Sequence, residues 1–164
     1  MSVHQAPFDR YRDRVRPEWI DENGHMNMGF YVVVFDKATD AFLDEIGLDA
    51  EHKLRKDVTT FTLEAHVNYL QEVRERAPLR FTTQLFAFDE KRIHYMHAMY
   101  QADEGFLAAT NELMSLHVSQ KTRRAAPMAP EVQARLGALL ELHTELPRPP
   151  QAGRSISLSA GKPV

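Results

Sequence analysis

The alternation of apolar and polar positions divides the chain into one long helix followed by several strands. Over residues 30–46 apolar side chains recur at steps of three and four around most of the circumference, which predicts a buried helix that ends at Gly47. Over residues 60–70 the period becomes two, with apolar residues at odd positions and polar ones at even positions, which predicts a strand. Three more strands are expected at residues 79–88, 92–101 and 106–118, and the short polar segments between them favour an antiparallel meander.

The remaining segments complete one domain. Phe8–Arg16 alternates roughly and predicts a first, half-exposed strand, whereas residues 51–57 predict a charged connection. Pro130–Leu142 predicts a short amphipathic helix. Beyond Leu146 the chain is rich in Pro, Gly and Ser with few large apolar residues, which predicts a mobile tail. We therefore expect one α+β domain over residues 1–146 and a tail over residues 147–164, a size typical of a single domain.

The composition of the chain limits which binding partners and which cell compartment are expected. The chain has 164 residues and a formal net charge of −3, which gives no general attraction to nucleic acid or to anionic membranes. It has no cysteine, so disulfides, thiolate nucleophiles and cysteine zinc sites are excluded, and a reducing compartment fits. Residues 1–16 contain no apolar run of signal-peptide length, and no stretch is long enough to cross a bilayer. We expect a cytoplasmic protein.

The polar loop before the predicted helix concentrates the reactive side chains. Residues 19–31 read WIDENGHMNMGFY, in which Asp21, Asn23, His25 and Asn27 bring a carboxylate, two amides and an imidazole into seven positions. A helix N-terminus offers unpaired N–H groups that stabilise an oxyanion, and a carboxylate on the preceding loop is placed to act as nucleophile or general base. The same residue types are common in ordinary turns and helix caps, so the spacing alone leaves a purely structural role open.

This loop also carries a family resemblance. The motif Asp-x-Asn-Gly-His-Met-Asn, followed by Tyr31 and a buried helix, resembles the signature of the 4-hydroxybenzoyl-CoA thioesterase-like branch of the hot-dog superfamily. It is similar to the Asp-x-Asn-x-His-Val-Asn-Asn motif of acyl-carrier-protein thioesterases, in which a second Asn stands where this chain has Met28, a departure that disfavours a long acyl chain. The order of elements agrees over residues 10–123. The resemblance implies a single hot-dog domain, an antiparallel sheet wrapped around a central helix, and an active site shared between two subunits.

The resemblance further implies catalytic roles in the hydrolysis of an acyl-CoA. Asp21 matches the catalytic carboxylate. Asn23 and His25 match polar residues that orient this carboxylate or a water molecule. The backbone N–H groups of Met28 and Gly29 fall where the oxyanion donors of the family lie.

A finer resemblance concerns the acyl group. The run from Asp21 to Phe35, with residues 38–40 and 62–66, is similar to betainyl-CoA thioesterases of carnitine catabolism and to the thioesterase domains fused to some carnitine dehydrogenases. Aromatic faces and a carboxylate are the groups that hold a quaternary ammonium. Most aromatic residues beside a helix belong to the core, however, and Glu64 on the polar strand face has a plain alternative as a solvated or inter-subunit group. Substrate contacts are expected from Trp19, Asn27, Tyr31, Phe35 and Glu64.

Basic residues near the strand ends are candidates for the coenzyme A phosphates. Guanidinium groups suit phosphate, and Arg92, Arg123 and Arg124 stand in basic pairs at predicted turns. Such pairs commonly only solubilise a turn. The chain has no Gly-rich phosphate loop, so ATP is not expected.

The sequence also bears on metal binding, on oligomeric state and on two alternative functions. His94 and His97 lie three apart on a predicted strand and face opposite sides, so the sequence predicts no metal site and no cofactor. A helix that is apolar on so much of its surface needs more cover than one sheet gives, so a homodimer or tetramer is expected. A hot-dog dehydratase stays open, although no His-Phe-Pro motif is found. A non-catalytic acyl-CoA-binding module also stays open, although such a module would need a fused domain.

Overall fold

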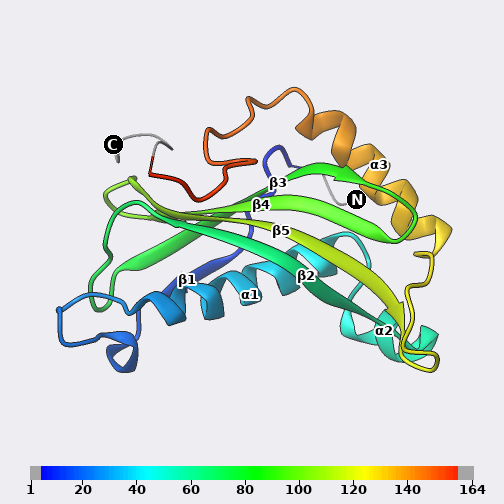
Figure 1. Cartoon of the computed structure of the whole chain (residues 1–164), viewed down its shortest axis with the longest axis horizontal. Coiled ribbons are helices and arrows are strands. Elements are labelled where there is room, and N and C mark those ends of the chain that lie inside the picture. The colour runs from blue at the N-terminus through cyan, green and yellow to red at the C-terminus, as the bar shows by residue number, and fades with distance from the viewer. Residues whose placement is uncertain (1–4, 159–164) are drawn as a thin grey trace.

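The chain folds into a curved five-stranded antiparallel sheet with one long helix along its inner face (Figure 1). This computed structural model describes residues 5–158. The strand order is β1-β3-β4-β5-β2, so the strand after the helix closes one edge of the sheet. The elements are β1 (Arg12–Arg14), the 3-10 turn η1 (Pro17–Trp19), α1 (Met28–Glu45), α2 (Ala50–Lys56), β2 (Val58–Tyr69), β3 (Pro78–Phe88), β4 (Arg92–Gln101), β5 (Leu107–Ser119) and α3 (Pro130–His143). The predicted α+β hot-dog class is confirmed.

Helix α1 is the central helix that the period of three and four predicts. Val34, Phe35 and Phe42 are fully buried between the helix and the sheet. The helix ends at Glu45 with Ile46 as its C-cap, and Gly47 follows with a φ of +85°, in the left-handed region that favours glycine. The prediction of burial around most of the circumference is wrong within one chain, because the sheet covers only one side of the helix. Met28, Val32 and Val33 stay exposed on the other side.

Strand β2 has a bulge that sequence alternation did not reveal. The register against β5 shifts between Thr62 and Glu64, so the two faces exchange at this point. Glu64 lies opposite Met114, and Ala65 lies opposite the core residue Leu113. Residues opposite each other in an antiparallel pair share a face, so Glu64 faces away from α1. Phe61, paired with Leu116, shares this outer face instead of the core face predicted for it.

Two predicted segments differ in length or type. Residues 50–56 form α2 rather than a charged connection, because the Asp49 side chain caps the helix by accepting from the His52 amide at 2.8 Å. The first strand is shorter than predicted, since only Arg12–Arg14 pairs continuously with β3. Phe8 forms one isolated bridge to Thr83.

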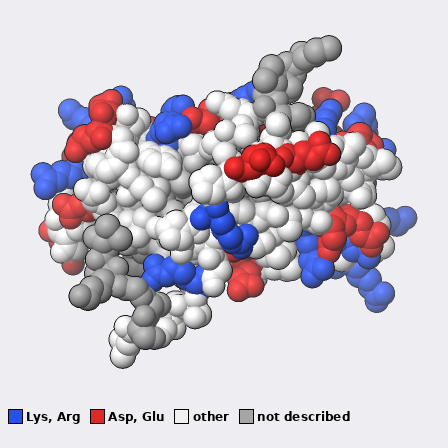
Figure 2. All heavy atoms as spheres, turned by 90° about the horizontal axis from the view of Figure 1, so that it is seen from above, with Lys and Arg blue, Asp and Glu red and all other residues white. Residues whose placement is uncertain are grey.

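The segment after α3 runs back over the outer face of the sheet. The guanidinium of Arg148 lies 4.3 Å from the ring centre of Phe86, and the Gly153 amide donates to Glu112 Oε2 at 2.7 Å. Figure 1 shows this segment on the side of the sheet opposite α1, and Figure 2 looks down on that side, where charges of both signs lie near the centre as well as at the rim. These contacts define a path for residues 147–154 that composition did not suggest. The domain boundary at Leu146 stays a prediction.

Candidate active site

The predicted catalytic loop is a tight turn fastened to the core. The Gly24 amide donates to the Asp21 carbonyl at 3.0 Å. Gly24 has a φ of +80°, a left-handed conformation that glycine adopts without strain and that other residues disfavour. The Asp21 amide donates in turn to the His25 carbonyl at 3.2 Å. Buried Met26 attaches the loop to the segment after β2, because its amide donates to the Val73 carbonyl at 2.9 Å. The loop therefore holds its polar side chains on a fixed frame.

The Asp21 carboxylate is oriented by two donors from its own loop. Its Oδ1 accepts from the Asn23 amide at 2.9 Å, and its Oδ2 accepts from Asn27 Nδ2 at 3.3 Å. The pKa of Asp21 is lowered, chiefly because the Asn23 amide hydrogen bond favours the ionised form. The carboxylate is therefore charged and positioned at neutral pH.

The start of α1 presents one open backbone donor beside this carboxylate. Asn27 caps the helix through Oδ1, which accepts from the Gly29 amide at 3.0 Å. The Met28 amide has no hydrogen-bond partner among residues 5–158. Of the two predicted oxyanion donors, Met28 is therefore available, whereas Gly29 is already used by the cap.

A hollow of about 500 Å³ connects this loop with the end of β2. Its second wall was not predicted from the sequence. The Tyr69 hydroxyl donates to the Met28 carbonyl at 3.1 Å, and its ring lies edge-on to Tyr31 with 5.1 Å between centres. Glu72 Oε2 lies 3.6 Å from His25 Nε2. The hollow is lined by Asp21, Asn23, His25, Met26, Asn27, Met28, Tyr31, Tyr69, Leu70, Gln71 and Glu72.

Two aromatic residues expected at the substrate lie in the core instead. Trp19 is buried and stacks on Phe30 with 5.8 Å between ring centres. Phe35 is fully buried, edge-on to Phe81 and stacked on His97. Substrate contact does not fit these positions, because neither ring borders the hollow. Of the predicted aromatic contacts, Tyr31 borders it.

Glu64 is not brought to the hollow either. It lines a separate hollow of about 330 Å³ on the outer face with His66, His94 and Glu112. The sheet lies between this position and Asp21. Glu64 lies on the polar face of β2 as the alternation predicts, and that face does not border the hollow around Asp21.

The predicted phosphate-binding arginines lie far from Asp21 within one chain. Arg92 pairs with Asp89, with 2.6 Å between Nη2 and Oδ2. Arg123 has its guanidinium 5.3 Å from the ring centre of Phe61, and Arg124 follows it in the turn after β5. Phe61 and Tyr69 are eight positions apart on β2, which corresponds to roughly 26 Å.

No three His, Asp or Glu side chains within residues 5–158 are placed to hold a metal ion. No helix in the same range is long and apolar enough to cross a membrane.

Most of the chain matches a known protein family. Residues 15–136 match the thioesterase-like superfamily. The chain belongs to this superfamily. The resemblance carried by the loop motif is thereby confirmed, and the loop, the central helix and strands β2 to β5 lie inside the matched thioesterase-like region.

Three individual proteins are similar to this thioesterase-like chain. The betainyl-CoA thioesterase of Pseudomonas aeruginosa is 46% identical over 148 residues, which are 90% of this chain and 93% of that protein. The L-carnitine dehydrogenase/betainyl-CoA thioesterase of Rhizobium meliloti is 36% identical over 151 residues, 92% of this chain but 30% of that longer protein. A hypothetical protein of Staphylococcus aureus, solved in complex with CoA, superposes with a TM-score of 0.85 at 27% identity and covers 94% of this chain and 99% of its own.

Proposed function

We propose that this protein hydrolyses the thioester of a short acyl-CoA, with the Asp21 carboxylate as the catalytic group. The observation that carries the proposal is an ionised, doubly hydrogen-bonded carboxylate in the same hollow as the unpaired amide of Met28. A thioester carbonyl that points to the Met28 N–H places its carbon near Asp21. The amide then stabilises the oxyanion, and the carboxylate attacks the carbon or activates water.

Betainyl-CoA is the proposed substrate. It is the substrate in the printed name of the Pseudomonas aeruginosa relative, which aligns along nearly its whole length. The hollow supports this choice because it offers the rings of Tyr31 and Tyr69 beside the carboxylates of Asp21 and Glu72. A cationic acyl group is stabilised by both kinds of group.

The working form is proposed to be a cytoplasmic homodimer formed along β2. This strand is an edge of the sheet, with β5 as its neighbour, and its unpaired backbone groups are a template for a second strand. Exposed Val32, Phe61 and Leu63 supply apolar surface on β2 and on α1 next to it. Antiparallel pairing of two β2 strands brings the Phe61 end of one subunit to the Tyr69 end of the other. Arg123 of one subunit then approaches the hollow of the other, where the coenzyme A phosphates need cations.

The experiment is thiol release from a panel of acyl-CoAs by wild type and Asp21→Asn. The amide keeps the shape of the side chain but removes both nucleophile and base, so we expect a loss of about 100- to 10,000-fold. Glu22→Gln is the matched control, because Glu22 is the neighbouring exposed carboxylate and does not line the hollow. Wild-type turnover by Asp21→Asn would reject the mechanism. Binding of acyl-CoA without thiol release would favour the non-catalytic module, and hydration of an enoyl-CoA would favour the dehydratase.

A further inference from the structure

We infer that Glu72 is the residue that selects a cationic acyl group in this hollow, an inference that rests on the proposed thioesterase function. Glu72 is the third residue after β2 and lines the same hollow as Asp21. Neither the motif of the catalytic loop nor the aromatic residues around it pointed to this position. Its role is to bind the substrate and not to take part in bond breaking.

The structure of the acyl group restricts where its charge can be recognised. In a betainyl thioester one methylene separates the ammonium nitrogen from the reacting carbonyl carbon, a distance of roughly 2.5 Å across two single bonds. A group that binds the ammonium must therefore border the hollow that contains Asp21. Glu64 does not meet this condition, because it faces the opposite side of the sheet.

The charges around the hollow leave Glu72 as the acidic group free for this task. Two carboxylates line the hollow, those of Asp21 and Glu72, and within residues 5–158 no Lys or Arg lines it. Both oxygens of Asp21 already accept hydrogen bonds from its own loop, which aim it at the carbonyl carbon. Glu72 keeps 51% of its side chain exposed, and its ion-pair distances to His25 and Arg74 are long, at 3.6 Å and 3.5 Å. Exposed pairs of this kind are weak, so the carboxylate can turn to a cation in the hollow.

Tyr69 supplies the aromatic part of the same wall. Its hydroxyl donates to the Met28 carbonyl, which holds the ring beside the start of α1 in the hollow that Glu72 also lines. The ring stays partly exposed, and it packs edge-on with Tyr31. A trimethylammonium group beside this ring and Glu72 gains a cation–π contact and a charge pair together. A neutral acyl group of the same shape gains neither.

The test compares two substrates that differ in one atom. Betainyl-CoA is paired with 3,3-dimethylbutanoyl-CoA, in which carbon replaces the quaternary nitrogen. We expect Glu72→Gln to lower kcat/KM for betainyl-CoA by about ten-fold, mainly through KM, and to leave the neutral substrate within about two-fold of wild type. Glu75→Gln is the control, because Glu75 is an exposed carboxylate three residues along that does not line the hollow.

Each other outcome has a separate meaning. Equal losses on both substrates, or no loss on betainyl-CoA, would overturn the role of Glu72. Wild-type enzyme that hydrolyses the neutral ester as well as betainyl-CoA would also overturn it, while leaving the thioesterase standing. If wild type hydrolyses neither ester, or if Asp21→Asn is fully active, the proposed function itself fails and the inference falls with it.

Discussion

At the scale of single residues, Asn27 links the proposed catalytic carboxylate of Asp21 to helix α1. One side chain accepts the Gly29 amide through Oδ1 and donates to Asp21 Oδ2 through Nδ2. The cap sets the rotamer of Asn27, and this rotamer fixes the position of the Nδ2 group that donates to Asp21. Capping and orientation of the carboxylate are therefore one structural feature, and the short spacing between Asp21 and Asn27 follows from it.

Asn27→Asp tests this coupling. The new carboxylate keeps the cap but places a negative charge where Asp21 now receives a hydrogen bond, so the pKa of Asp21 should rise. The lowered pKa of Asp21 in wild type means that activity is lost only as pH falls through that value, below the usual 3.8. We expect the acid limb of kcat in Asn27→Asp to move up by about one pH unit or more. Asn27→Ser, which keeps a capping oxygen without new charge, should move it less, and an unmoved limb in both variants would contradict the coupling.

His97 is the second residue whose chemistry is set by its surroundings. It is fully buried, with Nε2 2.9 Å from Thr39 Oγ1 and Nδ1 2.8 Å from Thr83 Oγ1. Thr39 Oγ1 donates to the Phe35 carbonyl at 3.1 Å, so it accepts from Nε2, and the neutral ring has both nitrogens satisfied. Burial lowers the pKa of His97 to about 3. This imidazole is part of the core and takes no part in the proposed reaction.

The buried imidazole predicts a pH dependence of stability. Because its pKa in the folded chain lies below the 6.5 of an unfolded one, the unfolded chain takes up a proton that the folded chain does not. The free energy of unfolding should therefore fall as pH drops below 6.5, by about 1.4 kcal/mol per pH unit. His97→Gln should be less stable at pH 7 but show a shallower slope between pH 6.5 and 4.5 in urea unfolding. Buried His117, whose pKa is also lowered, contributes to both proteins, so identical slopes would count against His97.

Sequence reasoning at the residue scale groups those residues of the candidate site that are close together in the chain. Asp21, Asn23 and Asn27 lie within seven positions, and the structure joins them by direct hydrogen bonds. Tyr69 and Glu72 are more than forty positions away, and only the return of β2 along α1 brings them to the loop. No local pattern marks such residues, because their proximity is a property of the sheet.

At the scale of elements, periodicity predicted the long strands and the long helices. Three of the errors are local: the cap at Asp49 that starts α2, the short pairing of β1, and the bulge in β2. A fourth is the exposed side of α1, which one sheet leaves uncovered. A bulge adds one residue to one strand without changing its composition, so alternation alone does not locate it. Its effect here is to place Phe61 on the outer face together with Glu64, whereas strict alternation puts Phe61 on the core face.

The exposed edge of β2 predicts the assembly. Leu63 is 55% exposed in the middle of this strand, and Leu63→Asp should place a charge in the paired interface and dissociate the dimer. Leu142→Asp is the control, because Leu142 is a 42% exposed leucine on α3, away from β2. Light scattering at micromolar concentration should give a dimer for wild type and Leu142→Asp and a monomer for Leu63→Asp. A monomeric wild type would reject the shared interface.

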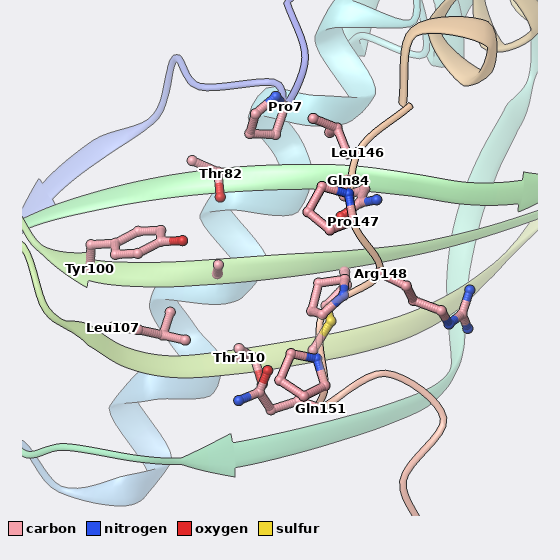
Figure 3. Close-up of a pocket in the computed structure, with 14 residues that line it drawn as sticks. Pro7, Thr82, Gln84, Tyr100, Leu107, Thr110, Leu146, Pro147, Arg148 and Gln151 are labelled. Atoms are coloured by element: carbon pink, nitrogen blue, oxygen red, sulfur yellow. The ribbon is translucent and has the colours of Figure 1, made fainter. Parts of the chain in front are cut away.

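At the scale of the whole molecule, the sheet is covered differently on its two faces. Helix α1 covers the inner face, and the segment after α3 crosses the outer face. Between this segment and the sheet lies a hollow of about 390 Å³, to which Tyr100, Leu107 and Thr110 contribute from the strands and Pro147 from the segment (Figure 3). No carboxylate or imidazole lines this hollow among the described residues, so it lacks the groups for the proposed reaction. The proposed active site therefore lies on the α1 side of the sheet, and we expect the outer segment to contribute to stability.

This division predicts the effect of truncation. A chain that ends at Leu146 loses the contact of Arg148 with Phe86 and the hydrogen bonds from Gly153 to Glu112 and from Arg154 to Asn68. Its prolines restrict the backbone of the segment, so little ordering entropy offsets these contacts. We expect a loss of about 2 kcal/mol and a Tm lower by roughly 5 °C.

The matched control for truncation is a chain that ends at Leu158, which keeps every one of these contacts. Its Tm should equal that of the full chain. Both truncated proteins should retain the kcat of wild type at low temperature, because Asp21 and Glu72 lie across the sheet from the segment. Dye binding to the newly exposed outer face should rise only in the shorter chain. An unchanged Tm after removal of residues 147–164 would show that the outer segment packs without stabilising the sheet, and would restore the mobile tail that composition predicts.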